Sequence, residues 1–130
     1  MSDNTVFKTE LEERINKINE QIESYLPEEK GHQSTIFEAM NYSVRAGGKR
    51  LRPLFMQEIC RLFTGEVQPT VVPFMAAIEM IHTSSLVHDD LPCMDDDMMR
   101  RGKASTWAEY GEDIGVLTGD ALMMYAFETA

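Results

Sequence analysis

The chain has 130 residues, of which 43% are hydrophobic, and a formal net charge of −10 at pH 7. This length is typical of one domain, and the hydrophobic content is sufficient for a buried core. The negative charge argues against nucleic acid as a partner, because binding to a polyanion requires a basic surface.

Two further classes of protein are disfavoured by the sequence. No apolar run reaches the about 20 residues that a membrane span requires, and the N-terminal segment lacks the basic and then apolar order of a secretory signal. Cys60 and Cys93 lie far apart, without CxxC or Cys/His spacing, which disfavours a disulfide framework and a zinc site. We expect a cytoplasmic protein with no membrane span.

Helical periodicity predicts an all-α fold, beginning with two helices. Apolar residues recur at helical spacing over residues 4–26, and Pro27 ends that pattern. A second helix is predicted over residues 33–46, with Ser34 or Thr35 as its N-cap. The side chains expected to face inward on the second helix are Ile36, Phe37, Met40 and Val44.

A third predicted helix follows Gly47-Gly48, which is a common kind of helix end. Pro53 suits its first turn, where the missing N–H costs nothing, and Gly65 ends it. The side chains predicted to form its buried stripe are Leu54, Phe55, Ile59 and Leu62.

The remaining sequence predicts a fourth helix over residues 70–90, a loop over 91–106 and a last helix over 112–130. The fourth helix has a broad apolar face and should be central. Because the last pattern stops without a capping signal, we expect the helical domain to be truncated. The apolar residues of the fourth helix are Phe74, Met75, Ala77, Ile78, Ile81 and Leu86.

The segment from Asp89 to Asp97 places five carboxylates within nine residues. Carboxylates packed this closely repel one another, so a bound cation would explain the cluster, and Mg²⁺ usually binds one or two carboxylates with waters and substrate phosphates. Pro92 disfavours continued helix and predicts a bulged turn, from which Asp95 would return towards Asp89. The alternative is an acidic loop without a metal, and the pattern of an EF-hand is missing.

Helical geometry places positions 78, 81, 82, 85 and 89 on one face of the fourth helix. A pocket that extends along this face from Asp89 would be lined by Ser85, Ile81 and Ile78. His82 lies near the same face, although a histidine in this position is more often part of the core.

The basic residues are also clustered, since six of the 12 Lys and Arg residues fall in two short stretches. In an acidic protein this distribution indicates binding of a compact anion, and two solvated basic turns are the alternative. The stretches contain Lys49, Arg50 and Arg52, and Arg100, Arg101 and Lys103.

These motifs together resemble the trans-polyprenyl diphosphate synthase family, which includes farnesyl and geranylgeranyl diphosphate synthases. Gly47 to Pro53 reads GGKRLRP, which is similar to the segment of that family that binds isopentenyl diphosphate. Leu86 to Gly102 is similar to its first aspartate-rich motif, in the DDxxxxD form, and Gly119 to Leu122 is similar to its GDALL segment. The resemblance implies an isoprenoid synthase-type helical bundle, a single domain of which residues 1–130 would be the N-terminal half. We expect exposed apolar surface, because the helices of the other half that would cover the fourth helix are missing.

The resemblance also implies roles for individual residues. Asp89 and Asp95 would ligate Mg²⁺ and Asp90 would support them, so that the metal holds an allylic diphosphate. Arg100 would contact that allylic diphosphate. The residues implied in binding isopentenyl diphosphate are Lys49, Arg52, His82 and Arg101; guanidinium and ammonium groups suit phosphate oxygens.

Product length and assembly stay open from the sequence. In the family, a bulky residue five positions before the first aspartate tends to limit the product to 15 carbons, and here Ser84, followed by Ser85, permits 20 carbons as well. Met98-Met99 replaces the Asp-Leu that is usual in bacterial-type sequences. The resemblance implies a homodimer, with a non-catalytic partner subunit or a class I terpene cyclase as alternatives. A second aspartate-rich motif, which the family carries in its other half, is not in this sequence, so we expect little activity from these 130 residues alone.

Overall fold

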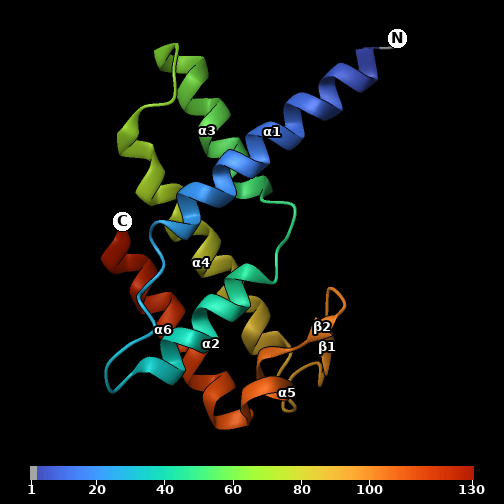
Figure 1. Ribbon diagram of the computed structural model, residues 1–130, viewed down its shortest axis with the longest axis vertical. Helices are drawn as coiled ribbons and strands as arrows, with labels where there is room; N and C mark the ends of the chain where they lie inside the picture. Colours follow the sequence, from blue (N-terminus) through green and yellow to red (C-terminus); the bar gives the residue numbers. More distant parts are fainter. Residues whose placement is uncertain (1–2) are drawn as a thin grey trace.

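The computed structural model describes residues 3–130, and its helices surround one central helix, α4 (Val72–Asp89) (Figure 1). Contacts with α4 come from α1, α2, α3 and α6. The all-α prediction is confirmed, with one two-stranded antiparallel hairpin added to it. The other elements are α1 (Asp3–Glu23), α2 (Ser34–Arg45), α3 (Leu51–Thr64), the 3₁₀ helix η1 (Pro69–Val71), β1 (Met99–Arg100), β2 (Lys103–Ala104), α5 (Thr106–Tyr110) and α6 (Glu112–Thr129).

The predicted helix ends are mostly confirmed. Gly65, with φ of 84°, caps α3 in the left-handed conformation that glycine adopts readily. Pro53 lies in the first turn of α3 as predicted. The N-cap prediction for α2 is wrong, because Gln33 occupies that position without a side-chain hydrogen bond and Ser34 and Thr35 lie inside the helix.

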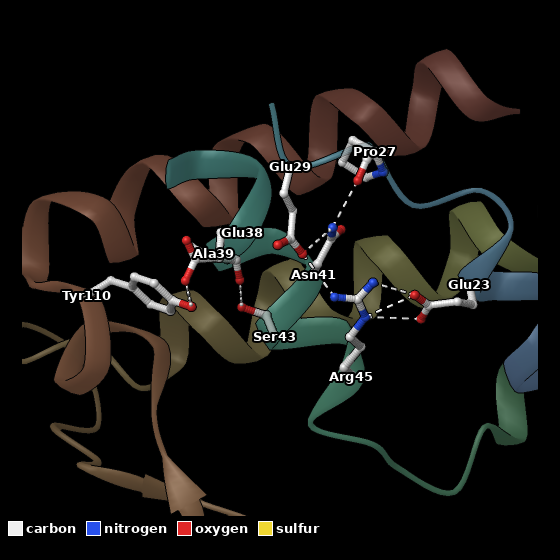
Figure 2. A network of polar contacts seen from close by, with 9 residues as sticks. All are labelled: Glu23, Pro27, Glu29, Glu38, Ala39, Asn41, Ser43, Arg45 and Tyr110. Atoms are coloured by element: carbon white, nitrogen blue, oxygen red, sulfur yellow. Dashed lines mark hydrogen bonds and ion pairs between the residues drawn. The ribbon is translucent and has the colours of Figure 1, made fainter. Parts of the chain in front are cut away.

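The connection between α1 and α2 is fastened by side chains of α2 (Figure 2). The Asn41 amide donates to the carbonyl of Pro27 and to the carboxylate of Glu29, each at 2.9 Å. Arg45 donates to Glu23 at the end of α1 and, at 2.9 Å, to Glu29. These contacts hold the end of α1 beside α2, so that both helices can pack on α4.

The core consists of apolar side chains from five helices. Its buried members are Ile18 and Ile22 on α1, Met40 and Val44 on α2, Leu54 on α3, Met75, Ala76, Ala77, Met80 and Val87 on α4, and Leu122 and Ala126 on α6.

The segment Pro69–Asp89 is long and apolar enough to cross a membrane by length and composition, contrary to the expectation from the sequence. Its packing explains that composition equally well, because this segment contains α4, the helix around which the others are arranged. A core helix covered on most sides needs apolar residues around much of its circumference.

One expectation about the core is wrong. Leu54 is buried, but Phe55, Ile59 and Leu62 are 61%, 56% and 79% exposed. The reason is that α3 packs on its neighbours through Pro53, Leu54 and Gln57, which leaves the rest of its apolar residues uncovered. Exposed apolar side chains were expected, and they occur on α3 and also on α6, where Leu117 and Phe127 are 52% and 68% exposed.

Helices α4 and α6 approach each other closely at Gly119. A Cβ atom at this glycine would lie 2.0 Å from Nε2 of His88, too close for any side chain. The Ser84 hydroxyl donates to the Gly119 carbonyl at 2.7 Å, and His88 Nε2 lies 3.0 Å from the carbonyl of Val116. The close contact holds the C-terminal half of α4 against α6, and the acidic segment begins at that end of α4.

Candidate active site

The acidic segment folds back on the end of α4. The N–H of Asp95 donates to the carbonyl of Asp89 at 2.8 Å, and the N–H of Asp97 donates to the carbonyl of Asp90 at 3.1 Å. The predicted bulged turn is therefore confirmed, and it brings the backbones of Asp89 and Asp95 together although six positions separate them. Both side chains are exposed.

The donor set at this turn fits a hard divalent cation. Asp89 and Asp95, whose backbones are joined by a hydrogen bond, both expose their carboxylates to solvent. Mg²⁺ characteristically takes one or two carboxylates together with waters and phosphate oxygens. Within residues 3–130 no three His, Cys, Asp or Glu side chains are arranged to hold a metal by themselves. Asp89 and Asp95 would supply two of the ligands, and waters or phosphate oxygens would supply the others.

Asp90 differs from its acidic neighbours because it is buried, with 2% of its surface exposed. Its two carboxylate oxygens accept hydrogen bonds from Nε and Nη2 of Arg100, each at 2.7 Å. The hydrogen bond that Arg100 donates to Asp90 raises the pKa of Arg100 and outweighs the opposing effect of burial. Asp90 therefore joins the end of α4 to Arg100, and its expected role in supporting the metal ligands stays a prediction.

The two arginines after the acidic segment lie on the hairpin that sequence analysis missed. Arg100 and Lys103 are partners in the pairing of β1 and β2, and the turn between them contains Arg101 and Gly102 with φ of 51° and 78°. A pair of two-residue strands is too short to show alternation in the sequence, but glycine directly after two arginines is a turn signal. The hairpin is fastened to α2, because Tyr42 donates its hydroxyl to the carbonyl of Ala104 at 2.7 Å.

The hairpin brings the two basic stretches together. The Arg101 guanidinium donates to the carbonyl of Gly47, and a Cβ atom at Gly48 would lie 3.1 Å from both terminal nitrogens of Arg101. Gly48 has φ of 147°, a conformation that other residues rarely adopt. Glycine at this position therefore lets the Arg101 side chain reach the segment before α3.

A pocket of about 410 Å³ lies between this segment, α4 and the hairpin. The four residues predicted to bind isopentenyl diphosphate all line it, although they come from three separate parts of the sequence. Burial, followed by the positive charge of Arg52, lowers the pKa of His82, while the charge of Glu79 opposes this shift. The lining residues are Gly48, Lys49, Arg50, Leu51, Arg52, Glu79, His82 and Arg101.

Arg50 was predicted only as part of the basic stretch, without a role of its own, and Glu79 was not singled out. The Arg50 guanidinium donates to Glu79 at 2.9 Å, and the two side chains are 6% and 4% exposed. Glu79 could have been noticed in the sequence, because it is the one acidic residue in the apolar stretch from Val72 to His88. A single carboxylate within a core helix usually has a charged partner.

The arrangement is matched by known proteins. The polyprenyl synthetase family model covers residues 33–130, which is most of the chain. The chain belongs to the polyprenyl synthetase family. Its curated relatives include the large subunit 1 of a heterodimeric geranylgeranyl pyrophosphate synthase from Arabidopsis thaliana, which is 56% identical over 93 residues. A chloroplastic geranylgeranyl pyrophosphate synthase from Capsicum annuum is 45% identical over 122 residues.

Solved structures show the same fold. A geranyltransferase from Legionella pneumophila superposes with a TM-score of 0.87 at 32% identity, and an FPP/GFPP synthase from Zymomonas mobilis with 0.84 at 40% identity. These superpositions cover 98% and 96% of this chain and 45% of each solved chain. The alignments with the Arabidopsis and Capsicum proteins cover 72% and 94% of this chain but 25% and 32% of the relatives.

In this member of the polyprenyl synthetase family, two of the residues predicted to line a chain-length pocket lie on the side of α4 that carries Asp89. Ser85 is exposed and Ile81 is half-buried, and their place along a pocket stays a prediction. Ser84 differs, because it is fully buried and its hydroxyl is used by the carbonyl of Gly119 on α6. The position five residues before Asp89 therefore faces α6, and Ser85 is the serine on the side of Asp89.

Proposed function

We propose that the whole protein is a prenyltransferase that condenses isopentenyl diphosphate with an allylic diphosphate in a Mg²⁺-dependent reaction. The observation that carries the proposal is the grouping of Lys49, Arg52, His82 and Arg101 around one pocket near the acidic end of α4. The guanidinium groups of two arginines and the ammonium group of a lysine are suited to binding a diphosphate. Exposed carboxylates are suited to binding a metal–diphosphate complex. Two substrates with diphosphate groups would use both features.

In this proposal the basic pocket and the acidic turn bind different substrates. Lys49, Arg52 and Arg101 would hold the diphosphate of isopentenyl diphosphate and keep its double bond in place. Asp89 and Asp95 would hold Mg²⁺, which supplies positive charge to the diphosphate that leaves the allylic substrate. Loss of that diphosphate leaves an allylic carbocation, which the double bond attacks; a proton is then lost and the product is five carbons longer.

Arg100 would keep donors for the allylic diphosphate although it is paired with Asp90. The pair uses the Nε–H and one N–H of Nη2, which leaves both N–H groups of Nη1 and the second N–H of Nη2. The pair would hold these remaining donors in a fixed direction next to the metal-binding turn. Orientation of a donor before the substrate arrives lowers the cost of binding.

Product length belongs to the proposal as well. We infer that the prenyl chain follows the side of α4 that carries Ser85 and Ile81, where small and apolar side chains would shelter it from water. This is compatible with a product of 15 or 20 carbons. The curated relatives named above are geranylgeranyl pyrophosphate synthases, which supports the longer product.

The test is turnover of the whole protein with isopentenyl and geranyl diphosphates. We expect product with Mg²⁺, none after chelation by EDTA, and none from Asp89→Ala. Asp97→Ala removes the same charge from the same turn and should remain active, because only the backbone of Asp97 is used in the turn. Turnover in EDTA, or an active Asp89→Ala variant, would refute the metal assignment. The 130-residue chain assayed by itself should show little or no turnover.

A second function has one observation in its favour. The Arabidopsis relative is named as the large subunit of a heterodimeric synthase, so this protein could act with a different subunit instead of as a homodimer. Purification of the whole protein from its natural source distinguishes the two: a single subunit type with turnover supports the homodimer, and a second subunit required for turnover supports the heteromer. The basic pocket disfavours a terpene cyclase, which has no isopentenyl diphosphate to bind.

A further inference from the structure

A buried ion pair lies beneath the basic pocket. Arg50 uses three of its donors within the protein: Nε donates to Asn19 at 2.8 Å, Nη2 to the carbonyl of Val44 at 2.8 Å, and Nη1 to Glu79 at 2.9 Å. These partners belong to α1, α2 and α4. Arg50, the central cation of the first basic stretch, therefore joins three helices. Lys49 and Arg52 are the cations of this stretch that would bind a diphosphate.

The position of Arg50 determines where those neighbours point. Arg50 is the N-cap residue of α3 and has φ of 51°, a left-handed conformation that is unusual for a residue with a side chain. Lys49 and Arg52 stand on either side of it, are exposed, and line the pocket. A conformation of this kind persists only where the surroundings hold it in place, and the three hydrogen bonds of the guanidinium do so.

The charge of Glu79 has no advantage for binding an anion. Glu79 lines the pocket, and its Oε2 atom is buried without a hydrogen-bond partner among residues 3–130. A carboxylate beside the cations weakens their attraction for a diphosphate, so electrostatics alone would favour its removal. Its value must therefore lie in what it holds, and its one side-chain partner among those residues is Arg50.

We propose that Glu79 is a positioning residue for diphosphate binding: by pairing with Arg50 it fixes the segment from Gly48 to Arg52 in the geometry that directs Lys49 and Arg52 into the pocket. This inference rests on the proposed function of the pocket as a diphosphate site. It assigns to the pair a role in affinity that is separate from its contribution to stability.

The decisive experiment replaces both members of the pair, as Arg50→Met with Glu79→Leu. The double substitution leaves the net charge unchanged, and apolar replacement of a buried ion pair is often neutral or stabilising, so the variant should fold. Binding of inorganic pyrophosphate to the whole protein is measured by calorimetry. We expect about tenfold weaker binding than in the wild type, because displaced cations lose much of their hold on a fixed anion. In turnover, KM for isopentenyl diphosphate should rise by a similar factor while kcat changes little.

A control uses the ion pair between Arg14 on α1 and Glu58 on α3, which lies outside the lining of the basic pocket. Arg14 donates to Glu58 at 2.7 Å, and neither residue lines the basic pocket. Arg14→Met with Glu58→Leu also removes one charge of each sign and should leave pyrophosphate binding unchanged. Wild-type affinity in the Arg50/Glu79 double variant would overturn the positioning role. A wild-type protein that does not bind pyrophosphate would instead overturn the proposed function of the pocket.

A milder variant keeps the proposal testable if the double variant does not fold. Asn19→Ala removes only the contact from α1 to the Arg50 guanidinium, and Asn19 does not line the pocket. We expect pyrophosphate binding to weaken about two- to threefold, in proportion to a partial release of the segment. Unchanged affinity in folded Asn19→Ala would contradict the proposal.

Discussion

Asp90 and Arg100 form a two-bonded ion pair at the end of α4, in which Nε and Nη2 of the guanidinium each lie 2.7 Å from a carboxylate oxygen. The pair joins the helix that begins the acidic segment to the hairpin that follows it. It also gives two adjacent aspartates different environments. Asp89 is exposed beside the acidic turn, whereas Asp90 is buried and occupied by the protein itself.

This separation predicts different effects of substitution at the two positions. Asp90→Ala leaves Arg100 partly buried without its partner and should lower the free energy of unfolding by about 2–4 kcal/mol. Asp89→Ala should change it by less than about 0.5 kcal/mol, because an exposed carboxylate contributes little to stability. Urea denaturation of both variants measures the difference. Equal stability of the two would show that the ion pair does not stabilise the hairpin.

The two serines before the aspartates should also behave differently. Ser85→Tyr places an aromatic ring on the exposed side of α4 and should shorten the product of the whole protein without loss of stability. Ser84→Tyr forces the same ring between α4 and α6, where overpacking should cost about 1–3 kcal/mol or more. Product analysis and thermal denaturation of both variants test this. A shorter product from a stable Ser84→Tyr variant, with no change from Ser85→Tyr, would reverse the assignment.

Much of this fold could be predicted because its signals are local. Gly65 and Pro53 mark the ends of α3, and the face from Ile81 to Asp89 follows from helical geometry alone. The bulge after Asp89 could be predicted from Pro92, which disfavours helix in the residue before it.

What could not be predicted depends on contacts between distant segments. Which face of α3 is covered is decided by the helices that reach it, so Phe55 and Ile59 appeared to belong to the core. Spacing placed Ser84 five residues before Asp89, but only the packing of Gly119 showed that its hydroxyl faces α6. Arg50 and Lys49 are adjacent cations in the sequence, but Arg50 is buried against Glu79, which is 29 positions away, whereas Lys49 is exposed.

The contact between Gly119 and His88 gives a third prediction. In Gly119→Ala the new methyl group would lie 2.0 Å from Nε2 of His88, so the helices must separate or the ring must move. We expect a loss of about 1–3 kcal/mol in the free energy of unfolding. The double variant with His88→Ala should recover part of this loss, because the clashing ring is absent. A double-mutant cycle measures the coupling, and additive losses would mean that the ring is not the obstacle.

The pH dependence of stability gives a last prediction, which concerns His82. Burial and the charge of Arg52 lower the pKa of His82 below its ordinary value of 6.5, so the folded protein binds a proton at this residue less readily than the unfolded chain does. Above about pH 6.5 His82 is neutral in both the folded and the unfolded protein, and its full contribution to the free energy of unfolding is present. This contribution is lost as the pH falls from about 6.5 towards the lowered pKa of the folded protein. His82→Gln removes the titration and should lose less stability than the wild type between about pH 8 and about pH 5.5. Urea denaturation of both proteins at the two pH values provides the measurement, and His32→Gln, at an exposed position of the α1–α2 connection, is the matched control. An equal loss in wild type and His82→Gln would show that burial and the neighbouring cations do not restrain the protonation of His82.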